Sequence, residues 1–318
     1  MLVLTALTGW SLLLVVSRVI LVNFGLDPWL FTFIQMMASG VFLLAVAGRG
    51  QVMGTLLRDG SIWVYGVLRV MTAAFFSAAL LYTSAANAAF MSILSVPTSV
   101  LFLWLVLSRI PKHWEIPGHV IIVFGLILLT TQLEDGWRNP AILLMILSEL
   151  CVVGSTVIAE LHPTNNTQNW RQRAGLTGLM LLASAAVMFA GAITLGILAQ
   201  TMPEIATWIP GQIAWMDNPG QALDPVLWVS AILVGILLRG PSMFLALAAI
   251  NAVRTENYLA GLAALPLTAL LFEAVAAQIG WLPQVSIWTL TTAFGGIMVV
   301  GSLWVVMART RLGREAPR

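Results

Sequence analysis

The chain has 318 residues, of which 59% are apolar and only 9% are charged, with a formal net charge of +2. A soluble domain carries closer to a quarter charged residues, so this chain lacks the polar surface that a water-soluble globule needs, and we predict an integral membrane protein. The single cysteine, Cys151, excludes an intramolecular disulfide and a cysteine-ligated metal cluster.

Apolar runs long enough to cross a bilayer divide the chain into ten segments. A transmembrane helix needs about 20 apolar residues, and glycine, proline and charged residues interrupt the runs. In chain order, the predicted spans are residues 2–22, 28–48, 61–83, 86–108, 117–133, 140–160, 176–198, 226–248, 258–279 and 287–308. These runs lack an alternation with a period of two residues, which excludes a β-barrel. The sequence therefore predicts an all-α integral membrane protein with ten transmembrane helices.

The first of these runs is expected to stay in the mature protein. Its start, "MLVLTALTGW", has no basic residues before the apolar stretch, and the stretch is longer than the core of a signal peptide. We interpret it as a retained first helix.

Basic residues gather on one side of the ten-span arrangement. The side of the termini holds eleven of them: Arg49, Arg58, Arg109, Lys112, Arg171, Arg173, Arg254, Arg309, Arg311, Arg314 and Arg318. The opposite side holds Arg138 together with acidic residues: Asp27, Glu134, Asp135, Glu204, Asp217 and Asp224. The positive-inside rule then predicts a multi-pass protein of the cytoplasmic (inner) membrane with both termini in the cytoplasm.

Two segments outside the spans follow from this orientation. Residues 201–225 form a long extracytoplasmic loop, and residues 309–318 form a basic cytoplasmic tail. Trp208 and Trp215 in the loop are expected to anchor it at the membrane surface. A lid over a substrate path is the alternative interpretation of this loop.

A weak internal repeat relates the two halves of the chain. Residues 65–107 align with residues 234–276, and the alignment matches Gly66 with Gly235 and Pro97 with Pro266. Halves of five helices each have opposite orientations in the membrane, because five is odd. We therefore predict two inverted five-helix repeats, 1–135 and 136–308, an arrangement typical of secondary transporters with a binding site between the halves.

Several stretches resemble a known family. "AALLYTSAANAAFMSILSVPTSVLFLWLVL" followed by "GHVIIVFGLILL" resembles the third-to-fifth helices of the drug/metabolite transporter superfamily, EamA type. "ALPLTALLFEAV", "TTAFGGIMVVGSLWVVMARTR" and the Trp10-containing "TGWSLLLVVSRVI" are similar to other helices of that family. The family often has a glutamate near the end of the fourth and ninth helices; here Arg109 and Ile279 stand there, and Glu273 lies earlier in its helix.

The resemblance implies a ten-helix carrier with a central cavity that moves small organic metabolites by alternating access. It implies no cofactor, and the sequence has no GxxxxGK[ST] loop for a nucleotide. The expected partners are a small-molecule substrate, the lipid bilayer and a coupling proton; we expect no nucleic acid, and the sequence leaves the oligomeric state open.

An enzyme and a channel are the alternative classes. A zinc protease motif, HExxH, is absent from the sequence, no aspartate lies inside a span, and the three histidines lie near the cytoplasmic ends of spans. A channel would be expected to show repeated polar or charged rings along a pore. We therefore predict a carrier rather than an enzyme.

Five charged residues lie within predicted spans: Arg18, Arg69, Glu149, Arg239 and Glu273. Arg18 is expected to reach the membrane surface with its long side chain, and Arg69 to do the same or to pair. Glu149 and Arg239 lie near mid-depth, where a charge is most costly. They form either a substrate site or a buried ion pair that locks two helices together.

The candidate residues for substrate binding or coupling are Glu149, Arg239, Arg69, Glu273, Trp10 and Tyr82. Glu149 is expected to face the cavity and to bind the cationic group of the substrate or a coupling proton. Mixed charges at mid-depth favour a substrate with both charges, such as an amino acid or a derivative of one. The alternative is a cationic amine, quaternary ammonium compound or drug held in an aromatic cage.

Overall fold

The structure is a computed structural model that describes residues 2–48, 58–110, 112–162, 169–202, 219–253, 255–283 and 289–312. Within these residues the regular structure is helical, and ten helices are long and apolar enough to cross a membrane. The ten predicted spans are therefore confirmed. Most of the loop 201–225, including Trp208 and Trp215, and most of the tail 309–318 lie outside the described residues.

Six spans are single helices: α1 (Leu2–Phe24), α2 (Pro28–Ala47), α4 (Gly60–Ala79), α8 (Pro140–Leu161), α9 (Trp170–Thr201) and α15 (Leu290–Leu312). The fifth span joins the 3₁₀ turn η2 (His113–Glu115) to α7 (Ile116–Thr130). Short 3₁₀ turns also lie between spans, η3 (Gly136–Arg138) and η6 (Pro219–Leu223).

Three spans change helix type at mid-length. The fourth joins α5 (Ala85–Met91), the 3₁₀ turn η1 (Ser92–Leu94) and α6 (Ser95–Leu107). The ninth repeats that order with α13 (Thr255–Gly261), η8 (Leu262–Ala264) and α14 (Leu265–Gln278). The eighth joins α11 (Pro225–Val234), the π-helix η7 (Gly235–Arg239) and α12 (Gly240–Val253). Such irregular segments are common at functional sites.

The span ends follow local chemistry rather than hydropathy alone. The seventh span begins at Trp170 instead of residue 176, because Asn169 caps it by accepting the N–H of Arg171 and the polar turn that follows continues the helix. The third span ends at Ala79 instead of residue 83, because residues 80–84 form the turn before α5. Apolar length detects the part of a helix inside the bilayer and misses such extensions.

Asp27 holds the start of α2. Its carboxylate accepts the N–H groups of Trp29 at 2.9 Å and Leu30 at 2.8 Å, and Pro28 occupies the first helical position, where its missing N–H has no consequence. Burial raises the pKa of Asp27 from 3.8 to about 6, and the two backbone hydrogen bonds oppose that shift. The charged form of this cap is therefore less stable in the fold than in the unfolded chain.

Asp27 should make stability depend on pH. Its folded-state pKa lies above the unfolded value, so the free energy of unfolding should rise as the pH falls from above 6 towards 4, by up to about 3 kcal/mol at 1.36 kcal/mol per pKa unit. Asp27→Asn keeps a capping oxygen but does not titrate. Its melting temperature in detergent should therefore exceed that of the wild type at about pH 7.5, and the difference should shrink near pH 5. An equal difference at both pH values would contradict this.

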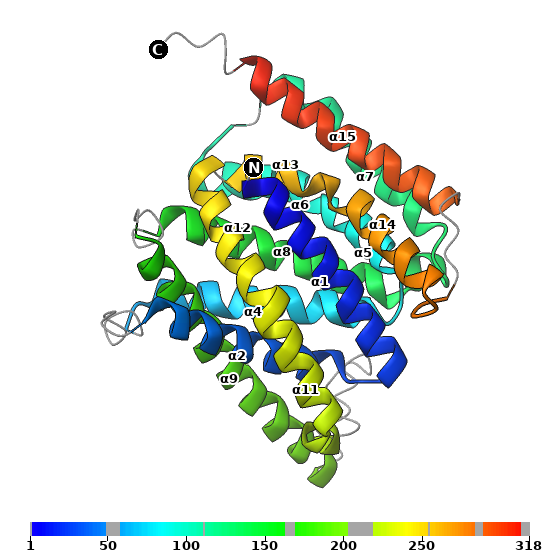
Figure 1. Ribbon diagram of the computed structural model, residues 1–318. Helices are drawn as coiled ribbons and strands as arrows, with labels where there is room; N and C mark the ends of the chain where they lie inside the picture. The colour runs from blue at the N-terminus through cyan, green and yellow to red at the C-terminus, as the bar shows by residue number, and fades with distance from the viewer. Residues whose placement is uncertain are drawn as a thin grey trace.

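Helices that are distant in sequence form the main contacts of the bundle. The largest helix–helix contacts join α2 to α9, α4 to α8 and α7 to α15, and α1 lies against α12 and α14. In Figure 1, α7 and α15 run side by side along the top right of the molecule, and the start of α1 and the end of α15 both lie towards the top.

The α2–α9 contact is close because it uses glycine. A Cβ on Gly40 would lie 2.7 Å from the carbonyl oxygen of Gly178, and a Cβ on Gly178 would lie 2.8 Å from that of Gly40. Small residues let transmembrane helices approach closely enough for dense van der Waals contact.

Candidate functional site

A cavity of about 100 Å³ lies in the middle of the bundle. It is lined by residues of α1, α2, α4, α6, α8, α12, α13 and α14, and of the three irregular segments η1, η7 and η8. Its charged and hydrogen-bonding side chains are Trp10, Ser17, Arg69, Thr72, Ser77, Ser92, Ser95, Glu149, Arg239 and Tyr258. The cavity thus combines an apolar wall with a few polar groups, as small-molecule sites do.

The π-helix η7 positions Arg239. At its start, Gly235 lies so close to α2 that a Cβ there would be 2.4 Å from the carbonyl oxygen of Gln35. At its end, Arg239 donates from Nε and Nη2 to the side-chain oxygen of Gln35, at 2.9 and 2.8 Å. The guanidinium also lies over the ring of Trp10, 5.5 Å from the ring centroid. An amide and an aromatic face therefore hold this cation.

Trp10 and Tyr258 form an aromatic wall. The indole N–H of Trp10 donates to the hydroxyl of Tyr258 at 3.2 Å, which joins α1 to α13. Tyr258 is fully buried, and Arg69 lies beside its hydroxyl. Buried tyrosine and tryptophan side chains usually find a polar partner of this kind.

Arg69 reaches the same cavity from α4. It is only 4% exposed, and its Nε and Nη2 have no hydrogen-bond partner. Of the two alternatives for Arg69, extension to the membrane surface or pairing, the structure does not show the first, because the side chain is buried in the cavity wall.

Glu149 lies in the cavity wall on α8 and is 4% exposed. Ser95 and Arg69 are the polar side chains that act on its carboxylate. No ion pair joins the described residues Glu149 and Arg239, since Arg239 bonds to Gln35. Glu149 and Arg239 therefore line the same cavity, but they do not form the ion pair that would lock their two helices together.

Two candidate residues lie away from the cavity lining. Glu273 on α14 is fully buried, pairs with Arg18 and accepts the N–H groups of Ala85 at 3.1 Å and Ala86 at 3.0 Å. Arg18 was expected to reach the membrane surface; the ion pair holds it inside the bundle instead. Tyr82 lies in the turn before α5 and is 37% exposed.

Other members of the site are uncharged and are not among the residues predicted from the sequence. Gln35 holds Arg239 and is the one amide in the apolar run 28–48, which is a signal that the sequence offers. Tyr258 and Ser95 gave no such signal, because a tyrosine at a span end and a serine inside a span are both ordinary.

A second hollow lies between α1 and α11. It is lined by apolar side chains and Ser230, so it brings no charged groups together and offers no specific chemistry.

Comparisons with known proteins agree with this architecture. The model of the EamA-like transporter family matches residues 1–131, which confirms the resemblance over that part of the chain. Among solved structures, 27 chains match. One of them, described as a crystal structure of a protein, is 16% identical with a TM-score of 0.62 and covers 98% of this chain and 97% of its own. At that identity the likeness shows the fold alone, over nearly the whole length. No curated protein matches the chain by sequence.

Proposed function

We propose that this multi-pass membrane protein, whose first 131 residues match the EamA-like transporter family, is a secondary carrier for a small charged or zwitterionic organic metabolite. An amino acid or a derivative of one is the expected substrate class. The protein moves it across the cytoplasmic membrane by alternating access, with a coupling proton as a further partner.

One observation carries this proposal: side chains of opposite charge line one cavity inside an apolar bundle. Glu149, Arg69 and Arg239 come from three spans and line the same hollow. Ionisable groups at membrane depth are costly and usually mark a substrate or ion pathway. The carboxylate suits an ammonium group, and the guanidinium groups suit a carboxylate.

The division into repeats 1–135 and 136–308 is part of the proposal, and helix contacts support it. The first span contacts the eighth, and the third contacts the sixth. Exchanging each span for its counterpart in the other half, the first for the sixth and the eighth for the third, turns one of these pairs into the other. The second and seventh, fourth and ninth, and fifth and tenth spans contact each other, and these pairs map onto themselves. A two-fold axis in the membrane plane would produce this pattern.

A carrier of purely cationic amines is the alternative. The aromatic wall of Trp10 and Tyr258 favours it, but two guanidinium groups in the same cavity would repel such a substrate. An enzyme is a weaker alternative, since the family match points to transport.

Transport by purified protein in proteoliposomes tests the proposal. Amino acids and their decarboxylated amines are offered as matched pairs, with imposed proton and potential gradients. The proposal expects the amino acid of a pair to be transported and to compete better than its amine. Transport of amines alone would favour the alternative substrate class, and no transport of any compound would contradict the carrier role for this class.

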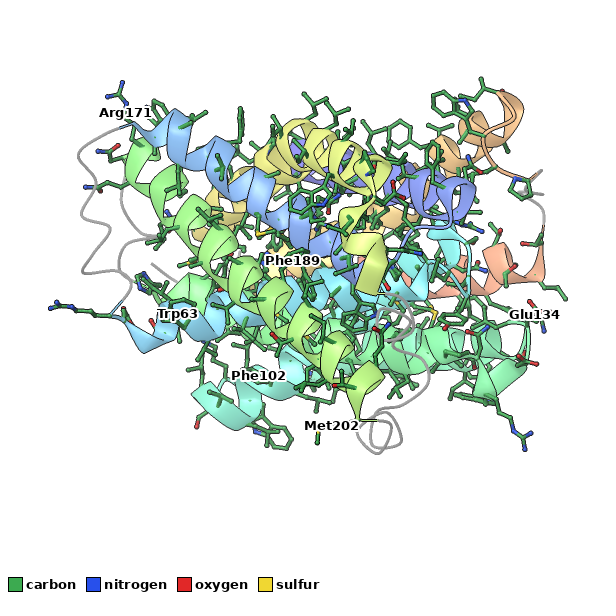
Figure 2. The ribbon with its side chains drawn as sticks, turned by 90° about the horizontal axis from the view of Figure 1, so that it is seen from below. Trp63, Phe102, Glu134, Arg171, Phe189 and Met202 are labelled. Atoms are coloured by element: carbon green, nitrogen blue, oxygen red, sulfur yellow. The ribbon has the colours of Figure 1, made fainter. Side chains whose placement is uncertain are left out.

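The orientation gives a separate prediction. Figure 2 shows Arg171 and Trp63 at one end of the bundle and Glu134 at the other. In a Cys151→Ala background, Asp135→Cys should react with an impermeant thiol reagent added to intact cells, and Lys112→Cys should react only in inside-out vesicles. Labelling of position 112 from outside intact cells would show that the termini are not cytoplasmic.

A further inference from the structure

The two arginines of the cavity differ in whether the Nε and Nη2 edge of the guanidinium group has a hydrogen-bond partner. In Arg239 the Nε and Nη2 edge is occupied by the side-chain oxygen of Gln35. In Arg69 the corresponding Nε and Nη2 groups are buried and have no partner. These two N–H groups point the same way and match the two oxygens of a carboxylate or phosphate.

The cavity also has more positive than negative groups, which favours the binding of an anion. Its lining has two guanidinium groups and one carboxyl group, a formal net charge of +1 with all three ionised. Among the described residues, neither Arg69 nor Arg239 has a direct ion pair. A buried charge without an ion pair destabilises a fold. An anion that pairs with such a guanidinium group should therefore bind favourably.

We propose that the free edge of Arg69 is an oxyanion subsite that binds the carboxylate of the transported metabolite. The inference deepens the proposed function: it assigns the anionic end of the substrate to Arg69 and leaves its cationic end to Glu149. A carboxylate fits better than a phosphate, because the cavity has one free bidentate edge and a single excess positive charge.

Arg69→Met tests the subsite in purified, detergent-solubilised protein. Melting temperatures are measured without ligand and with single amino acids, their decarboxylated amines and inorganic phosphate. Without ligand, Arg69→Met should melt within a few degrees of the wild type, because it removes a buried charge with no ion pair among the described residues but also the cation that acts on Glu149. Its apparent Kd for amino acids should rise about tenfold or more, while the Kd for the matched amines stays unchanged or falls, because one repelling guanidinium group is gone.

Two further variants sharpen the result. Arg69→Lys keeps the charge but loses the bidentate edge, so its Kd should lie between the other two. Arg171→Met removes an exposed arginine at the start of α9 and should change nothing. Equal weakening of amino acids and amines by Arg69→Met would assign Arg69 a structural role and overturn the subsite.

The melting experiments with different ligands test the subsite separately from the transport function. Protection of the wild type by phosphate but not by amino acids would overturn the carboxylate assignment. Protection by neither would overturn the subsite, whereas transport in proteoliposomes is judged independently.

Two further clusters, at the starts of α5 and α13, resemble each other in composition. The outer cluster consists of Arg18, Glu273 and the N–H groups of Ala85 and Ala86 at the start of α5. The inner cluster consists of Arg109, Glu160 and the N–H group of Thr255 at the start of α13. Glu160 lies 3.0 Å from Arg109 and 2.9 Å from the N–H of Thr255. In both clusters a carboxylate binds an arginine and the first backbone N–H of a half-helix, and Glu273 also binds the second.

The half-helices held by these carboxylates end at irregular turns in the cavity wall. α5 ends at η1, which is followed by Pro97, and α13 ends at η8, which is followed by Pro266. The turns η1 and η8 contact each other and line the cavity. A mid-helix 3₁₀ turn next to a proline, which lacks the N–H for the helical bond, is a natural hinge.

We infer that the two clusters are the outer and inner latches of the carrier. Release of Glu273 frees α5 to swing about η1 and opens the cavity outwards, and release of Glu160 frees α13 to swing about η8 and opens it inwards. Both latches are closed in this structure, since each glutamate is bound to its arginine. Opening of only one latch at a time would give alternating access.

Accessibility of a cysteine in the cavity tests the latches without any substrate. Thr72→Cys lines the cavity on α4 and is placed in a Cys151→Ala background. An impermeant thiol reagent is then added to intact cells or to inside-out vesicles. Adding Glu273→Gln should speed labelling from outside about tenfold, the effect of losing a charge-assisted hydrogen bond, and not from inside. Glu160→Gln should do the reverse.

Glu115→Gln is the matched control. It breaks the ion pair of Glu115 with Arg309 at 3.0 Å, which joins η2 to α15 away from the cavity lining, so both labelling rates should stay the same. Equal acceleration from both sides by either latch variant would indicate general loosening and overturn the inference, as would no acceleration by either. Because labelling needs no transport, the result is independent of the substrate.

Discussion

Glu149→Gln is expected to reduce transport by about 10- to 100-fold while the yield of folded protein stays unchanged. The substitution keeps the size of the side chain and its hydrogen bonding but removes the charge that would bind the ammonium group or a coupling proton. Since Arg239 is held by Gln35 rather than by Glu149, loss of the carboxylate leaves that arginine with its partner. The fold should therefore tolerate the change.

Initial rates in proteoliposomes at matched protein density measure this effect. Glu134→Gln, which removes a carboxylate in the turn between α7 and α8, serves as the control and should transport normally. If Glu149 only locked α8 to the eighth span, the variant would lose yield and Arg239→Met would restore both yield and transport. Full transport by Glu149→Gln between about pH 5 and 8 would exclude a role of the charge in binding or coupling.

Gly178→Leu should remove most of the folded protein. A Cβ at this position would lie 2.8 Å from the carbonyl oxygen of Gly40 and 2.9 Å from the backbone nitrogen of Leu44. Backbone atoms of a neighbouring helix cannot move aside as the end of a side chain can, so α2 and α9 must separate. Overpacking of this kind costs about 1–3 kcal/mol or more, in the largest helix–helix contact of the bundle.

The same helix supplies the matched control. A Cβ on Gly191 in α9 would meet no heavy atom within 4 Å, so Gly191→Leu should fold and gain helix propensity of about 1 kcal/mol. Size-exclusion profiles and melting temperatures of the two variants measure the difference. A monodisperse Gly178→Leu that melts within a few degrees of the wild type would mean that the close α2–α9 contact is not required.

Four of the six candidate residues meet in the cavity: Glu149, Arg239, Arg69 and Trp10. The polar group inside an apolar run was therefore a useful signal, because a charge in a membrane needs a partner or a pathway. The same signal also selected Glu273, whose partners are Arg18 and the start of α5. Hydropathy does not distinguish a carboxylate that faces a cavity from one that caps a neighbouring helix.

Hydropathy and charge along the chain are sufficient to predict an all-α membrane protein, its ten spans and the asymmetry of charge. These follow from length and local chemistry: every backbone polar group in a bilayer must bond within its own helix, so an apolar run of the right length is sufficient to predict a span. Which charged residues lie close together depends instead on how the helices pack. Arg239 could equally have paired with Glu149, but the π-helix η7 and the close approach of Gly235 to α2 direct it to Gln35. Contacts between residues 204 positions apart depend on how ten helices pack, which no local pattern records.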